Sequence, residues 1–154
     1  MTAAVEYLSN KASQVEIAEH LCRCDEDFVP PLSGRVEIQG YAQKIASRAT
    51  RFETWSGGTL VGLVAAYCND RETRIAYITS VSVLKAFTGK GIAARLVKQC
   101  IEHAKASGMR RISLEVAIDN APAIRLYEKC GFVAGTLKPP FVAMDLHLTK
   151  RGRT

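Results

Sequence analysis

Two glycines flank a lysine at Gly89-Lys90-Gly91, and an apolar run with helical spacing begins at the next residue. The first turn of a helix presents backbone N–H groups without an intrahelical partner, together with roughly half a positive charge. Glycines just before such a turn let the backbone approach an anion closely, and Lys90 adds a mobile cation. Residues 87–93 are therefore predicted to bind an anion, and a phosphate group fits such a site.

Known phosphate-binding patterns narrow the kind of site. Gly89-x-Gly91-x-x-Ala94 formally matches a dinucleotide fingerprint, with Glu115 about twenty residues further on. The rest of the chain is too short for the additional strand–helix–strand units that a dinucleotide domain needs. A P-loop is excluded, because Gly91 follows Lys90 and no glycine lies five positions before Gly89. A connecting turn without a ligand stays open at this point.

The segments around the turn predict a strand, a crossover helix and a second strand. Residues 74–84 have the pattern of a strand, residues 91–107 carry apolar side chains at a period of 3.6, and residues 110–118 alternate apolar positions with others. A unit of this kind is right-handed and contains two parallel strands. The predicted anion site thus lies between the first parallel strand and the helix.

The chain before this unit predicts an antiparallel meander. Gly57-Gly58 separates the strand-like segments 49–56 and 59–68, and Asn69-Asp70 marks the turn into residues 74–84. The fold class is therefore α/β, with a mixed sheet in which an antiparallel N-terminal meander joins a parallel strand pair.

Further elements are expected on either side. Ser13 and Ser33 are expected to cap two helices ahead of the meander, and Asp119 or Asn120 caps a short helix after the parallel pair. The remaining strands are expected over residues 3–8, 132–137 and 141–148.

Composition and length favour a single soluble domain. The chain has 154 residues, of which 47% are hydrophobic and 23% charged. No segment approaches the ~18 consecutive apolar residues of a membrane span, and the N-terminus lacks the basic start and apolar core of a signal peptide. We expect one domain over residues 1–154, with a flexible tail at 149–154, a cytoplasmic location and no membrane partner.

Charge and cysteine usage exclude other classes of function. The net charge is +6, but lysines and arginines are spread along the chain, and the aromatic–basic pattern of an RNA-binding sheet is missing. We therefore expect no nucleic-acid partner. The five cysteines form no C-x-x-C pair, which predicts reduced thiols, and the spacing of cysteine and histidine predicts no metal site.

Two motifs resemble the GNAT superfamily of acetyl-CoA-dependent N-acetyltransferases. The first is a strand V-x-V, then a loop [QR]-x-x-G-x-[GA] and a helix, which here are Val81-Ser82-Val83 and Thr88-Gly89-Lys90-Gly91-Ile92-Ala93. The second joins a strand LEV to N-x-x-A-x-x-L-Y-x-x-x-G-F, which here are Leu114-Glu115-Val116 and the segment from Asn120 to Phe132. The resemblance covers roughly residues 74–135.

The resemblance implies how acetyl-CoA would bind. The parallel strands are expected to splay apart after Val83, the pantetheine arm to pair with the first strand, and the pyrophosphate to lie on residues 88–93. Thr88 replaces the family's Arg or Gln and brings no charge, so backbone N–H groups are expected to carry most of the phosphate binding. The implied cofactor-binding residues are Val81, Val83, Thr88, Gly89, Lys90, Gly91, Ile92, Ala93 and Asn120.

The reaction that the family performs needs an acid and a base. Tyr127 is the candidate acid for the leaving thiolate, because the family's tyrosine lies near the thioester sulfur and a phenol of pKa ~10 is protonated at neutral pH. Packing in the core is the alternative for this side chain. Glu115 is the candidate base, directly or through water, and it points away from the strand face of Leu114 and Val116. His20 and the acidic segment 25–27 are alternative bases.

The resemblance thus implies an N-acetyltransferase that transfers acetyl from acetyl-CoA to a primary amine by direct attack in a ternary complex, without a metal. The acceptor stays open among a small molecule, an amino sugar and a protein N-terminus, although the acidic segment 25–27 favours a cationic one. The alternative is a non-catalytic sensor or partner module that binds acyl-CoA, which the uncharged Thr88 favours. Monomer and homodimer both stay open.

Overall fold

The computed structural model describes residues 4–148, so the expected flexible tail at 149–154 lies outside the described residues. Seven strands form one sheet in the order β1-β2-β3-β4-β5-β7-β6. The β4–β5 pair is parallel, and every other neighbouring pair is antiparallel, which confirms the expected mixed sheet. The strands are β1 (Glu6–Ser9), β2 (Thr50–Ser56), β3 (Thr59–Tyr67), β4 (Ile75–Val83), β5 (Arg111–Ala117), β6 (Val133–Lys138) and β7 (Phe141–His147).

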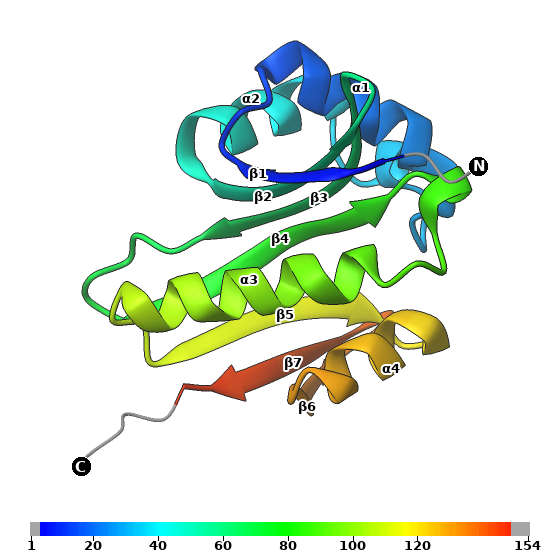
Figure 1. Ribbon diagram of the computed structural model, residues 1–154. Helices are drawn as coiled ribbons and strands as arrows, with labels where there is room; N and C mark the ends of the chain where they lie inside the picture. Colours follow the sequence, from blue (N-terminus) through cyan, green and yellow to red (C-terminus); the bar gives the residue numbers. More distant parts are fainter. Residues whose placement is uncertain (1–3, 149–154) are drawn as a thin grey trace.

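Helices cover both faces of the sheet. The helices are α1 (Gln14–Cys24), α2 (Ile38–Arg48), α3 (Ile92–Ala106) and α4 (Ala121–Lys129). Short 3-10 turns lie at Asp25–Asp27, Leu32–Gly34 and Lys85–Phe87. Figure 1 shows α3 crossing the sheet over β4 and β5, with α4 beside it and α1 and α2 grouped at the other end of the sheet. No helix within residues 4–148 combines the length and the apolar character needed to cross a bilayer.

Capping explains where the first two helices begin. Ser13 caps α1 as expected: its Oγ accepts a hydrogen bond from Glu16 N at 3.1 Å, and the Glu16 carboxylate accepts one from Ser13 N at 2.9 Å. The expectation that Ser33 caps the second helix is wrong. Ser33 lies in a 3-10 turn and donates its N–H to Asp25 Oδ1 at 2.7 Å, while Glu37 caps α2 by accepting from Gly40 N at 2.8 Å.

Two apolar clusters fill the interior, one on each face of the sheet. The larger one contains residues of β2–β5, β7, α3 and α4, and the smaller one packs α1 and α2 against β2 and β3. Gly62 of β3 lets α3 approach closely, because a Cβ there would lie 2.9 Å from Ile92 Cγ2. The start of α3 is therefore fixed directly against the sheet.

The parallel pair opens earlier than expected. β4 and β5 pair only from Ile75 with Arg111 to Tyr77 with Ser113, so the strands separate after Tyr77 and not after Val83. Figure 1 shows the two arrows diverging toward the end where α3 begins. A bulge contributes to this shape: Ser80 lies opposite Ala65 and Ile78 opposite Ala66, which leaves Thr79 as an extra residue.

Candidate functional site

A cleft of about 360 Å³ lies where β4 and β5 diverge. Its walls come from segments that are distant in the sequence: the α1–α2 loop, the second half of β4, residues 115–117 of β5, the start of α4, and Phe141 of β7. Clefts at the carboxyl ends of parallel strands are the usual ligand sites of such sheets.

The free edge of β4 forms one wall of this cleft. Residues 78–83 continue the strand beyond its last pairing with β5. Their backbone groups on that edge are not used by β5, and an extended ligand could pair with them as an added strand does. Val81 and Val83, two of the residues expected to bind the cofactor, line the cleft at this edge.

The glycine turn has the geometry of an anion site. Gly89 and Gly91 have φ angles of 78° and 79°, a region that favours glycine, and a Cβ on either would meet no atom within 4 Å. Gly91 is the N-cap of α3 without a side-chain cap, and the first backbone bond of the helix runs from Arg95 N to Gly91 O. The N–H groups of residues 92–94 therefore have no partner inside the helix.

The side chains of the turn differ in what they can offer. Thr88 and Ala93 line the cleft, and Thr88 Oγ1 donates to Lys85 O at 2.7 Å, which leaves its oxygen lone pairs as acceptors. Ile92 is 3% exposed and packs in the core, so only its backbone N–H could reach an anion. Lys90 is exposed and is not among the described residues that line the cleft.

Tyr127 lines the cleft and belongs to the core at the same time. Its side chain is 7% exposed, and its ring packs edge-on against Phe132 at a centroid distance of 6.0 Å. Burial, and then the nearby Cys130 thiol, raise the pKa of Tyr127 above that of a free phenol. The hydroxyl therefore stays protonated at neutral pH.

Glu115 lines the cleft on the opposite face from the apolar side chains of β5. Leu114 and Val116 are buried in the core, as the alternation predicted, and the Glu115 side chain is 36% exposed. Lys138 of β6 pairs with it at a distance of 3.4 Å between Nζ and Oε2. Burial and then the negative charge of Glu115 raise the pKa of Tyr77, which places these two side chains near one another.

Asn120 and the alternative bases have defined structural roles. Asn120 is the cap of α4 and accepts from Ala123 N at 3.3 Å, so the expected choice between Asp119 and Asn120 falls on Asn120, which also lines the cleft. The carboxylate of Asp25 accepts a hydrogen bond from the Ser33 N–H, and Asp27 lines the cleft. His20 is buried and lies beside β4.

Several cleft residues were missed from the sequence, Arg35, Phe141 and Ser82 among them. Arg35 lies in the α1–α2 loop and Phe141 in β7, and the two side chains are in contact at the cleft. No pattern of neighbouring residues in the sequence predicts this contact. Ser82 is also part of the wall, and the only sequence signal for it was its position in the middle of Val81-Ser82-Val83.

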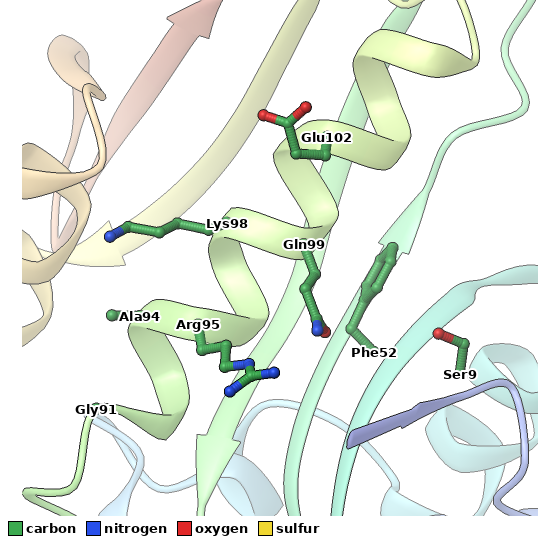
Figure 2. A pocket seen from close by; sticks show the side chains of 8 residues that line it. All are labelled: Ser9, Phe52, Gly91, Ala94, Arg95, Lys98, Gln99 and Glu102. Carbon is green, nitrogen blue, oxygen red and sulfur yellow. The ribbon is translucent and has the colours of Figure 1, made fainter. Parts of the chain in front are cut away.

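A second cavity, of about 640 Å³, lies beside α3 on its flank toward β1 and β2 (Figure 2). Figure 2 shows Arg95 and Gln99 extending from α3 toward Phe52 of β2, and Lys98 pointing to the other side of the helix. Its lining includes Gly91 but no residue of β4 or β5. The cleft, with its free strand edge and convergent polar groups, is therefore the candidate site.

The known proteins that this chain resembles are acetyltransferases. The profile of the family described as Acetyltransferase (GNAT) family matches residues 15–132. The chain is 34% identical over 83 residues to N-alpha-acetyltransferase MAK3 of Arabidopsis thaliana, covering 53% of this chain and 44% of that protein. It is 35% identical over 78 residues to mycothiol acetyltransferase of Corynebacterium glutamicum (strain R), covering 51% of this chain and 26% of that protein. The chain thus spans less than half the length of either relative.

Among solved structures, yncA from Salmonella typhimurium, determined with its cofactor acetyl-CoA, superposes with a TM-score of 0.75 at 18% sequence identity. The match covers 97% of both chains. At this identity the likeness shows a shared fold.

Proposed function

The chain belongs to the acetyltransferase (GNAT) family, and on that premise we propose that it transfers an acetyl group from acetyl-CoA to a primary amine by direct attack in a ternary complex. One arrangement carries the proposal: Thr88 and Ala93, which lie on either side of the glycine turn, line the same cleft as the free edge of β4, and the first N–H groups of α3 have no partner inside the helix. An extended carrier with a diphosphate at one end and a thioester at the other needs both features together.

The residues present fit such a carrier. The N–H groups at the start of α3 and of the preceding glycine turn bind the diphosphate, and the open space at Gly89 and Gly91 leaves room for its oxygens. Thr88 and Lys90 act as supporting polar groups, and Asn120 lies where the carrier would pass α4. The backbone of Val81 and Val83 pairs with the amide groups of the pantetheine arm.

Acid and base catalysis fall to two residues on opposite walls. Tyr127 hydrogen-bonds to the leaving sulfur and donates a proton to it; because the thiolate resembles that of cysteine, with a pKa of ~8.5, it is a good leaving group that needs little assistance from an acid. Glu115 takes the proton of the attacking amine, directly or through a water molecule, from the face of the sheet opposite the apolar core. A backbone N–H of the free β4 edge stabilises the oxyanion.

The nature of the acceptor follows from the lining of the cleft and from the relatives. Asp27 and Glu115 supply negative charge and Phe28 and Phe141 supply apolar contact, which together suit an amine on a small molecule or at a protein N-terminus. One relative is named as an N-alpha-acetyltransferase and the other as a mycothiol acetyltransferase, so proteins of this family act on acceptors of both sizes.

Acetyl-CoA turnover across a panel of amines and short peptides, measured by thiol release, tests the proposal. The expected result is turnover with at least one acceptor, and a loss of acetyl-CoA affinity of tenfold or more in Gly89→Asp, because a carboxylate in the turn repels the diphosphate. Acetyl-CoA binding without turnover on any acceptor would favour the sensor or partner module instead. Absence of binding would contradict both.

A further inference from the structure

Ser82 and His20 form a hydrogen-bonded pair at the wall of the cleft. His20 of α1 is 2% exposed, and its Nε2 lies 2.9 Å from Ser82 Oγ on β4. Its other ring nitrogen, Nδ1, lies 3.0 Å from the carbonyl oxygen of Leu60 on β3. Cys24, one turn along α1, places its Sγ 3.7 Å from the same Nε2.

The direction of these hydrogen bonds follows from the chemistry of the partners. A carbonyl oxygen can only accept, so Nδ1 carries the proton and donates it to Leu60. Burial, which outweighs the two hydrogen bonds, lowers the pKa of His20 to about 4, so the ring is neutral and Nε2 is an acceptor. Ser82 therefore donates its hydroxyl hydrogen to His20, and at least one lone pair of its oxygen is left over beside the nearby Cys24 thiol.

The bulge in β4 determines which side of the sheet Ser82 faces. Val81 and Val83 pack toward the cluster that includes α3, so Ser80 and Ser82 face α1 on the other side of the sheet. Ser82 lines the cleft and is 9% exposed. It shares this side with Glu115, whereas the glycine turn and Tyr127 lie on the side of α3 and α4.

We propose that Ser82 Oγ accepts a hydrogen bond from the attacking amine, and that His20 is the positioning residue that holds this oxygen as an acceptor. The proposal rests on the proposed acetyltransferase function and adds a residue to it. With its hydrogen committed to His20, Ser82 offers an N–H donor a fixed partner and aligns the nitrogen lone pair toward the cleft. Glu115 keeps the separate role of taking the proton.

The pair also implies a preference among acceptors. A site that presents a hydroxyl as an acceptor discriminates against a ligand atom that can only accept, because two acceptors would face each other without a hydrogen between them. A neutral primary amine has two N–H groups, so it can donate one of them to Ser82 and still direct its lone pair at the thioester. Tertiary amines, with none when neutral, do not.

Kinetics of Ser82→Ala, His20→Phe and the double variant test the proposal in the full chain with an accepted amine. We expect Ser82→Ala to lower kcat/KM for the amine about ten- to a hundredfold, since the lost bond gains strength as charge develops on nitrogen. KM for acetyl-CoA should stay within twofold. His20→Phe should lower kcat/KM about three- to tenfold, because the hydroxyl remains but loses its orientation, and the double variant should equal Ser82→Ala alone.

Controls separate this role from a structural one. Thr54→Val removes a buried hydroxyl without a partner on β2, away from the cleft, and should leave both constants unchanged. His20→Asn replaces His20→Phe if the larger ring prevents folding, because the shorter amide breaks the contact with Ser82 without adding volume. Losses that multiply in the double variant, or a Ser82→Ala enzyme within twofold of wild type, would overturn the proposal.

Nitrogen NMR of the imidazole tests the geometry independently of activity. Between pH 6 and 8 the His20 ring should be neutral, with Nδ1 protonated and Nε2 bare, and Ser82→Ala should shift Nε2 more than Nδ1. A proton on Nε2 would overturn the proposal. Absence of turnover by the wild type across the amine panel would overturn the proposed function and this inference with it, whereas equal turnover by wild type and Ser82→Ala would overturn the inference alone.

Discussion

The guanidinium carbon of Arg35 lies 5.4 Å from the ring centroid of Phe141. Arg35 precedes α2 and Phe141 opens β7, so the contact joins two walls of the cleft that are far apart in the sequence. A cation over an aromatic ring contributes ~0.5–1 kcal/mol at exposed sites. Phe141 is part of the lining that is proposed to contact the amine, so its contact with Arg35 supports that part of the acceptor site.

Arg35→Ala is therefore expected to raise KM for the amine about two- to fivefold, the equivalent of the lost contact, and to leave KM for acetyl-CoA unchanged. Steady-state kinetics with each substrate varied in turn measures both constants. Lys44→Ala is the matched control, because its Nζ lies 5.5 Å from the Tyr67 ring centroid in a contact of the same kind outside the cleft. An equal change in both KM values would mean that Arg35 does not act on the acceptor.

The sequence predicted those parts of the site that depend on local patterns. The glycine turn, the crossover helix and the parallel strands are each encoded within a few neighbouring residues, and the structure contains all three. Ser33 and Glu37 show where a prediction from local sequence fails, because either side chain can cap a helix. In the structure Ser33 bonds to Asp25 in the preceding loop, and Glu37 caps α2 instead. Capping preference alone favours the serine.

Contacts between distant segments could not be predicted. The opening after Tyr77 depends on how long β5 stays paired with β4, and the strand pattern continues unchanged past that point. Similarly, the partners of His20 are Leu60 and Ser82, which lie on two different strands. No periodicity in the sequence connects such residues, because their proximity results from the packing of α1 on the sheet.

Gly91→Ala tests whether the glycine turn requires its left-handed backbone. A Cβ on Gly91 would meet no atom, so the expected cost is backbone strain alone, about 1–2 kcal/mol of the free energy of unfolding. Urea unfolding measures this cost, and acetyl-CoA affinity should fall as the turn changes shape. Gly34→Ala is the control: it also has open space, but its φ is ordinary, and it should stay within about 0.5 kcal/mol of wild type.

Gly62→Ala tests whether close contact with β3 fixes the start of α3. The added Cβ would lie 2.9 Å from Ile92 Cγ2 and 3.3 Å from Leu96 Cδ1, so the Ile92 side chain or the first turn of α3 must move. Overpacking of this kind costs about 1–3 kcal/mol of stability. We expect a lower unfolding midpoint together with weaker acetyl-CoA binding, by calorimetry. If the variant were destabilised but bound acetyl-CoA with unchanged affinity, the position of α3 would not matter for binding by the glycine turn.

Glu53 is a buried carboxylate that ties the N-terminal segment to β2. It is 0% exposed and accepts from Ala12 N at 3.1 Å, Arg51 Nε at 3.2 Å and Trp55 Nε1 at 3.0 Å. Glu53→Gln leaves the buried Arg51 charge without its partner, which should lower the free energy of unfolding by about 3–5 kcal/mol. The exposed pair of Glu102 with Lys105 provides the comparison, since Glu102→Gln should change stability by less than about 0.5 kcal/mol.

His20 should make the stability of the protein depend on pH. Burial, with a smaller contribution from the charge of Arg23, lowers the pKa of His20 from 6.5 to about 4 in the folded chain. Between those two pH values the unfolded chain binds a proton that the folded chain does not. The free energy of unfolding should therefore be unaffected by His20 above pH 6.5 and fall by a total of about 3 kcal/mol as the pH drops to 4.

The measurement is urea unfolding of wild type and His20→Asn at intervals from pH 7.5 to pH 4. Other groups also titrate in this range, so the difference between the two curves isolates His20. That difference should shrink as the pH falls, because protonation of His20 in the unfolded chain destabilises the wild type, whereas the asparagine of the variant does not titrate. Parallel curves for wild type and His20→Asn would show that the imidazole is not buried in its neutral form, and the orientation assigned to Ser82 would fail with it.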